Sequence, residues 1–407
     1  MIKNQIKRLM ISTVLISIFC FSFGFADKIS SKQLAKSNND FALKLYDALK
    51  VDDENLFFSP YSISTALAMT YAGAKGKTKT EMAKVLEFHL SGDSLHAGFS
   101  QISSELNEIK KQGDVELSTA NALWIEKSFS LLPNYKQLVN KYYNSEVFRT
   151  DFLKNSDNAV KQINNWVEEK TNDKIKNLLK PNNLSSLTKL VLTNAIYFKG
   201  LWDSQFDKRA TRQLPFFISE KEKINTPIMF LKEKFKYAET ENAQILEMPY
   251  MGKQLSMVII LPNEIEGIKK IGKIIKKEKL LEIQRYPQKV KVWLPKFTMT
   301  ERYKLNKVFL KLGMKDAFDS RAANFSGMTG NEDLFISGIF HKAFIKVEEK
   351  GTEAAAATAV VMELKSAPPG KVTEFRADHP FLFYIQDNST GSILFMGKVN
   401  RPSVESG

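Results

Sequence analysis

The order of the apolar segments constrains the fold of this chain more than any other feature. The first half carries apolar residues at helical spacing. This spacing predicts helices over 31–49, 61–74, 78–86 and 158–178, with an extended strand at 115–125. From residue 190 onward, short apolar runs predict buried strands at 190–198, 257–261, 289–294, 343–347, 381–385 and 393–399. Helices grouped before strands are typical of an α+β fold.

The first 26 residues have the pattern of a signal peptide. Lys3, Lys7 and Arg8 precede an uncharged apolar stretch over 9–25, and Ala26 offers a small residue for cleavage before Asp27. An uncleaved membrane anchor is the alternative. We therefore expect a signal peptide over 1–26, a single domain over 27–407 and a secreted or periplasmic protein that leaves the membrane after cleavage.

Cysteine usage excludes several kinds of site. The chain has one cysteine, Cys20, which lies inside the expected signal peptide. The mature chain would then have no disulfide, no cysteine nucleophile and no zinc–thiolate site. The four histidines have no metal-ligand spacing, so we expect neither a metal nor a cofactor.

Two short motifs resemble enzyme signatures without their context. Gly92–Leu95 matches a four-letter esterase signature, but it lies in an expected polar loop, and Asp378 and His379 are adjacent rather than three residues apart. In 73–78 the glycines are too close together for a phosphate-binding loop. We therefore expect no catalytic residues and no enzyme.

The net charge of +14 raises the question of a polyanionic partner. The densest basic stretch runs from Lys269 to Lys279, with isoleucines interleaved at helical spacing. An amphipathic helix with a solvated lysine face explains this stretch, and a polyanion-binding face is the alternative.

The segment between two strong strands near the C-terminus is the most unusual part of the sequence. Residues 351–359 are almost all small, and helix propensity alone would predict a helix there. Residues 365–370 then form a polar stretch interrupted by Pro368 and Pro369. A run of small residues therefore leads into a long exposed loop.

Five motifs in sequence resemble the serpin family over the whole expected mature chain, and the resemblance is to a secreted, bacterial-type member. They are Asn55–Ile63, Asn194–Trp202, Leu294–Phe297, Phe375–Phe383 and Phe395–Val399. The resemblance implies a serpin fold with three β-sheets, about eight to nine helices and a reactive-centre loop over about 349–374. It also implies a monomer that traps a protease covalently as a suicide substrate.

In that mechanism the loop is cleaved and inserts as a new strand into the central sheet while the protease remains attached as an acyl-enzyme. The resemblance places the hinge of insertion at Glu349, Gly351, Thr352, Glu353, Ala354, Ala355, Ala356, Ala357 and Thr358. Small side chains there keep the barrier to insertion low. Thr352, Ala354, Ala356 and Thr358 would share one face of the new strand.

Counting fifteen residues from Gly351, as the resemblance implies, places the reactive bond at Lys365–Ser366. A lysine at this position suits a trypsin-like protease. A register shift of one residue would instead present Leu364 to a chymotrypsin-like enzyme. A non-inhibitory serpin with a binding or chaperone role and an inhibitor of papain-like cysteine proteases are the alternative functions.

The resemblance assigns two further groups of residues. Ser59, Ser62, Asn194 and His341 match the shutter, a polar cluster under the central sheet where its strands part. Trp202, Lys296 and Glu349 match the breach, where the loop first enters the sheet. His341 would be a structural element of the switch rather than a catalyst.

Overall fold

The computed structural model describes residues 30–352 and 372–404. Its first helix covers 30–49. The other helices are α2 (Pro60–Gly73), α3 (Gly76–Val85), α4 (Gly92–Lys111), α5 (Pro133–Tyr143), α6 (Phe152–Lys170), α7 (Ile271–Glu278), α8 (Asn306–Leu312) and α9 (Ser326–Thr329). Among the described residues, no helix is long and apolar enough to cross a membrane.

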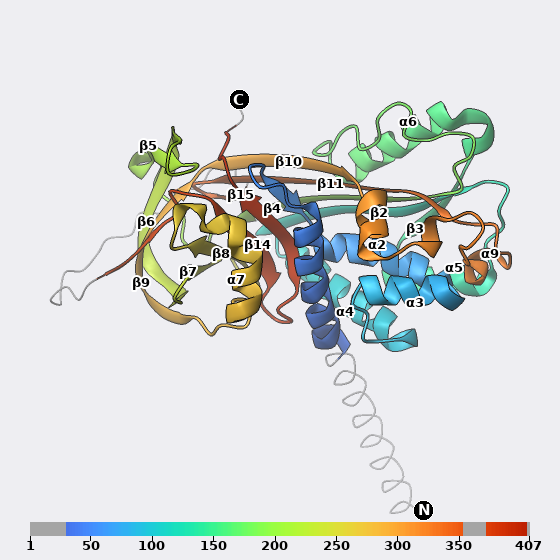
Figure 1. The fold of residues 1–407 in the computed structure, drawn as a ribbon, viewed down its shortest axis with the longest axis horizontal. Coiled ribbons are helices and arrows are strands. Elements are labelled where there is room, and N and C mark those ends of the chain that lie inside the picture. The colour runs from blue at the N-terminus through green and yellow to red at the C-terminus, as the bar shows by residue number, and fades with distance from the viewer. Residues whose placement is uncertain (1–29, 353–371, 405–407) are drawn as a thin grey trace, which may run out of the picture.

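The strands form two hydrogen-bonded sheets within the described residues. The six-stranded sheet has the order β10-β11-β12-β4-β2-β3. Its strands are β2 (Val115–Glu126), β3 (Glu146–Thr150), β4 (Leu190–Leu201), β10 (Phe297–Lys304), β11 (Ile336–Glu348) and β12 (Gly351–Thr352). Figure 1 shows β10, β11 and β4 running side by side across the molecule.

The second sheet has nine strands. They are β1 (Leu56–Phe58), β5 (Arg212–Phe217), β6 (Lys223–Glu239), β7 (Ala243–Pro249), β8 (Leu255–Pro262), β9 (Tyr286–Pro295), β13 (Thr373–Arg376), β14 (Phe381–Asp387) and β15 (Ile393–Val399). The long strand β6 pairs with β5 and β9 and also with β7. The group β5, β6, β9 and β13, which would be the third sheet, is therefore continuous with the second.

The six-stranded sheet is covered on both faces because β4 is apolar on both sides. Ile196 and Phe198 belong to the larger core, whereas Ala195 and Tyr197 belong to a second core under α6. In Figure 1, α6 lies on one side of this sheet and α2 on the other. A strand buried on both faces has a continuous apolar sequence, which is why β4 could be predicted.

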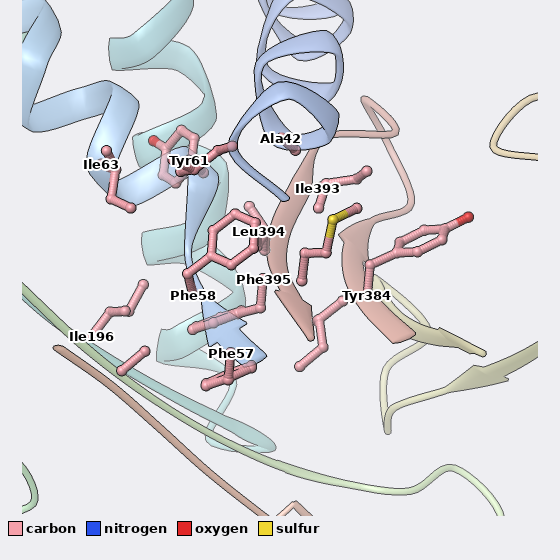
Figure 2. Packing of buried hydrophobic residues seen from close by; sticks show 14 of the residues in the cluster. Ala42, Phe57, Phe58, Tyr61, Ile63, Ile196, Tyr384, Ile393, Leu394 and Phe395 are labelled. Atoms are coloured by element: carbon pink, nitrogen blue, oxygen red, sulfur yellow. The ribbon is translucent and has the colours of Figure 1, made fainter. Parts of the chain in front are cut away.

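Aromatic side chains fill the space between the two sheets. Phe57 of β1 stacks on Phe395 of β15 with ring centroids 5.6 Å apart, and Phe395 lies 5.5 Å from Phe198. Figure 2 shows Phe57, Phe58 and Phe395 gathered beside Ile196 of β4. This core joins the β4 region to the nine-stranded sheet.

The bounds or the type of some elements differ from the sequence-based expectation. The helix expected at 158–178 begins earlier and ends earlier, as α6. Asp151 caps its N-terminus by accepting a hydrogen bond from Lys154 N–H, and its apolar pattern continues into the non-helical residues Ile175, Leu178 and Leu179. Gly92–Leu95, expected in a loop, forms the first turn of α4.

Candidate functional site

The chain reverses direction where β11 ends. Glu349 and Lys350 form a two-residue turn, and β12 runs back between β11 and β4, pairing Thr352 with Val347 and also with Gly200. Further along, β11 and β4 pair directly, from Ile336–Leu190 to Phe344–Tyr197. We call this line of direct pairing the seam. At the end of β4 that contains Leu201, β12 therefore already separates β11 from β4.

Gly351 lies where only a glycine fits. A Cβ atom added there would lie 2.1 Å from the carbonyl oxygen of Gly200 and 2.7 Å from Cα of Leu201. Any side chain would push β12 away from β4. Glycine therefore allows the close backbone approach that lets this short strand enter the sheet.

Thr352 is fully buried, and its Oγ1 lies 2.9 Å from the hydroxyl of Tyr250. Tyr250 stacks on Trp202 with ring centroids 4.7 Å apart. The indole Nε1 of Trp202 donates a hydrogen bond to the Glu348 carbonyl at 3.1 Å, and its backbone N–H donates to Lys350. These two aromatic residues hold both sides of the turn.

The turn residue Glu349 is anchored by a cation and a hydroxyl. Lys296 Nζ lies 2.9 Å from its Oε2, and Thr211 Oγ1 donates to its Oε1 at 2.9 Å. Burial acts to raise the pKa of Glu349, but the hydrogen bonds from Lys296 and Thr211 outweigh burial and hold that pKa below its ordinary value. The carboxylate therefore remains charged and fixes the turn.

A polar cluster spans the seam farther along β4. His341 and Asn194 face each other in register, and the His341 Nδ1 contacts the Asn194 Oδ1. The Asn194 amide donates to Ser62 Oγ and to Asn121 Oδ1. Ser59 N–H donates to His341 Nε2 at 3.2 Å. The four residues predicted as the shutter are thus in contact through one network.

Ser59 has a second role at the start of α2. Its hydroxyl oxygen accepts from Ser62 N–H at 3.1 Å and donates to the Leu394 carbonyl at 2.6 Å. Pro60 follows at the first helical position, where its missing N–H costs nothing. The residue that caps α2 therefore also positions His341.

His341 is fully buried, and burial lowers its pKa to about 3. Because Nε2 accepts from Ser59, the proton of the neutral ring resides on Nδ1 and is donated to Asn194. The histidine therefore acts as an uncharged bridge between β11, β4 and α2.

This pKa predicts a pH dependence of stability. Below the ordinary pKa of 6.5 the unfolded chain binds a proton at residue 341 that the folded chain does not bind. The stabilisation is complete above pH 6.5 and decreases as the pH falls toward 3, by ~1.4 kcal/mol per pH unit. We expect His341→Gln to make urea unfolding less steeply pH-dependent between pH 6 and 5.

His96 sets the background for that measurement, because burial lowers its pKa to about 4. His96 therefore also makes stability decrease as the pH falls, in the wild type and in His341→Gln alike. Identical slopes for the wild type and His341→Gln would contradict the buried neutral state of His341.

Several predicted residues lie outside the described part of the chain. They are Glu353, Ala354, Ala355, Ala356, Ala357, Thr358, Lys365 and Ser366. The described ends of the expected loop at 349–374 are structured: the turn and β12 precede the gap, and β13 begins after it at Thr373. Gly351 and Thr352, at the start of the run of small residues, are buried in the sheet.

Sequence reasoning missed Asn121, Tyr250 and Thr211. Asn121 lies in a strand that also contains Glu116, Ser118, Thr119 and Glu126, so no local signal distinguished it. Nothing in the local sequence marks Tyr250 or Thr211, because their partners lie about 100 residues or more away.

Comparison with known proteins identifies the family. The sequence profile described as "Serpin (serine protease inhibitor)" matches residues 36–402. The chain belongs to the serpin family. It is 43% identical over 378 residues to Serpin B6 of Macaca fascicularis, covering 91% of this chain and 99% of that protein. It is 41% identical over 383 residues to the leukocyte elastase inhibitor of Homo sapiens, covering 91% of this chain and 100% of that protein.

A solved structure agrees with this assignment. Serpin48 of the insect Tenebrio molitor, a highly specific serpin, superposes with a TM-score of 0.82 at 35% identity over 91% of this chain and 98% of that chain. The expected serpin fold is thereby confirmed. The assignment of the turn at Glu349 to the breach and of the His341 cluster to the shutter stays a prediction.

Proposed function

We propose that this serpin inhibits a trypsin-like serine protease by trapping it as an acyl-enzyme. The observation that carries the proposal is that Gly351 and Thr352 already lie between β4 and β11. A cleaved loop could extend this short strand along the seam. Each added residue would move an attached protease by about 3.3 Å.

Small side chains support extension of the strand beyond Thr352. The residues that follow are Glu353 and then four alanines and a threonine, Ala354 to Thr358. Alternate side chains would enter the core in the manner of Thr352, whose hydroxyl contacts Tyr250. Residues of this size can pass between two strands without large displacement of the core.

Lys365 is the residue proposed to enter the specificity pocket of the protease. Lys365–Ser366 is the peptide bond proposed to be cleaved. A lysine complements the carboxylate at the base of a trypsin-like specificity pocket. We expect Lys365→Glu to abolish the SDS-resistant adduct with trypsin, whereas Lys371→Glu, a matched change near the end of the same segment, leaves it in place. An adduct of unchanged yield with Lys365→Glu would refute this assignment.

The mature protein in this proposal is a secreted or periplasmic monomer that spans 27–407 as one domain. Residues 1–26 support export, because a basic start, an apolar stretch and a small residue before Asp27 form a signal peptide. Binding of a polyanion to Lys269–Lys279 is not part of the proposal. Lys269 is paired with Glu266 and Lys276 with Asp47, at 2.9 and 2.7 Å.

A further inference from the structure

The outer face of β6, β9 and β13 concentrates positive charge. Lys232 of β6 lies directly opposite Lys291 of β9, and Lys234 lies opposite Lys289. The residues that alternate with Lys289 and Lys291 on β9, Val290 and Val292, are buried. The lysines therefore project from the same face of the sheet, in two directly opposed like-charge pairs. Such pairs destabilise a sheet.

Two exposed carboxylates lie near these lysines, Glu374 and Glu233, and the Glu233 carboxylate accepts from Lys234 N–H rather than from an ammonium group. Glu374 of β13 contacts Lys291 and Arg376, each at 3.1 Å. Within 30–352 and 372–404, no carboxylate forms an ion pair with Lys232, Lys234 or Lys289. The face therefore has three exposed ammonium groups that are available to an acidic partner.

An aromatic and cationic edge borders the lysines. The Arg376 guanidinium lies 3.7 Å from the centre of the Trp293 ring, and Phe230 lies 4.9 Å from the same ring. Phe230 and Trp293 are only half-buried. Aromatic residues and arginine are enriched at protein interfaces. We call Phe230, Lys232, Lys234, Lys289, Trp293 and Arg376 the basic face.

The position of the basic face indicates which partner it meets. β13 begins eight residues after Lys365, and eight residues span at most about 28 Å. A protease domain of 200–250 residues has a radius of gyration of about 17 Å. A protease bound at Lys365 therefore brings its own surface within reach of this face.

We infer that the basic face is a docking surface for an acidic patch beside the active site of the target protease. This inference rests on the proposed inhibitory function and adds a second determinant of specificity to Lys365. Lysines that face a complementary charge accelerate association by steering the encounter, and salt weakens the effect.

The test uses two trypsin isoforms of the same primary specificity, one anionic and one cationic. The rate constant for loop consumption, by adduct formation or by cleavage, is measured for the full chain at low and high salt. The variant carries Lys232→Gln, Lys234→Gln and Lys289→Gln. The control carries Lys136→Gln, Lys154→Gln and Lys161→Gln on α5 and α6, at the other end of the molecule (Figure 1).

With the anionic isoform at low salt, we expect the basic-face variant to react about tenfold more slowly than the wild type. The control, with the same change in net charge, should stay within about twofold, and high salt should remove the difference. The cationic isoform should not distinguish the two variants. The melting temperature of the basic-face variant should be no lower than that of the wild type, because removing opposed lysines relieves repulsion.

An equal rate for the wild type and the basic-face variant would overturn the inference, as would an equal loss in both variants. Heparin that binds the wild type but not the basic-face variant, with unchanged rates toward both isoforms, would assign the face to a polyanion and also overturn it. Loop cleavage without an adduct would contradict the inhibitory function while the rates still report docking. Absence of any loop consumption would contradict both.

Discussion

Thr352→Glu is expected to convert this serpin from an inhibitor into a substrate. The Thr352 side chain is fully buried between β4 and β11 and contacts the Tyr250 hydroxyl at 2.9 Å. A carboxylate at this position would be buried with no cation among the described contacts of Thr352, and such burial costs several kcal/mol. Insertion would then be blocked at its first step.

The measurement is the number of inhibitor molecules consumed for each trypsin molecule inhibited. A barrier raised by several kcal/mol should increase this number by at least about tenfold, while the rate of loop cleavage stays near the wild-type value. Thr352→Ser, which keeps the hydroxyl, should behave as the wild type does. A Thr352→Glu variant that still gives adduct at full yield would show that strand entry does not pass through this position.

Asn194→Leu is expected to cause the largest loss of stability. One amide joins His341, Ser62 and Asn121 across the seam. A leucine would leave His341 Nδ1 buried without a partner and would remove the Asn194 hydrogen bonds of Ser62 and Asn121, which keep only the bond to each other. Each lost or unsatisfied hydrogen bond costs about 1–3 kcal/mol. We expect the free energy of unfolding in urea to fall by about 3 kcal/mol or more, whereas Asn107→Leu on the exposed side of α4 should change it by less than about 0.5 kcal/mol.

A double-mutant cycle with His341→Phe tests whether the cluster acts as one network. If it does, the double variant should lose less than the sum of the two single losses, by about 0.5–3 kcal/mol. Strict additivity would mean that His341 and Asn194 stabilise the protein independently.

The helix at 30–49, α2 and α3 were predicted to within two residues at both ends, whereas the bounds of α6 and β11 were not. β15 is buried along its whole length, and its apolar run matched its bounds. β4 and β14 are buried except near their C-terminal ends, and there the strands extend beyond the expected runs by three and two residues. β11 begins seven residues before the expected 343, because Gly338, His341 and Lys342 interrupt the apolar run that identified it. The ends of α6 depend on a cap from Asp151 and on Glu126, which accepts from Phe152 and Leu153 N–H, and neither contact has a periodic signal.

The candidate site also contains some residues that the sequence identified and some contacts that it did not. Gly351 and Trp202 could be assigned because the family motifs fix their register. The partial entry of β12 could not, because it depends on the approach of Gly351 to the Gly200 carbonyl and on Tyr250 from another part of the chain. Helix propensity describes only local contacts, and here the neighbouring strands β4 and β11 determine the conformation.

The most direct test of the central claim is the melting temperature before and after cleavage of the loop at Lys365. Insertion of the cleaved loop along the seam would add a full strand to the six-stranded sheet and bury its alternate side chains. We expect the melting temperature of the cleaved wild type to rise by about five degrees or more, because strand burial adds several kcal/mol and each kcal/mol raises it by about 1–2 °C in a chain of this length. The cleaved Thr352→Glu variant should show little rise. A cleaved wild type that melts at the temperature of the intact protein would contradict the account.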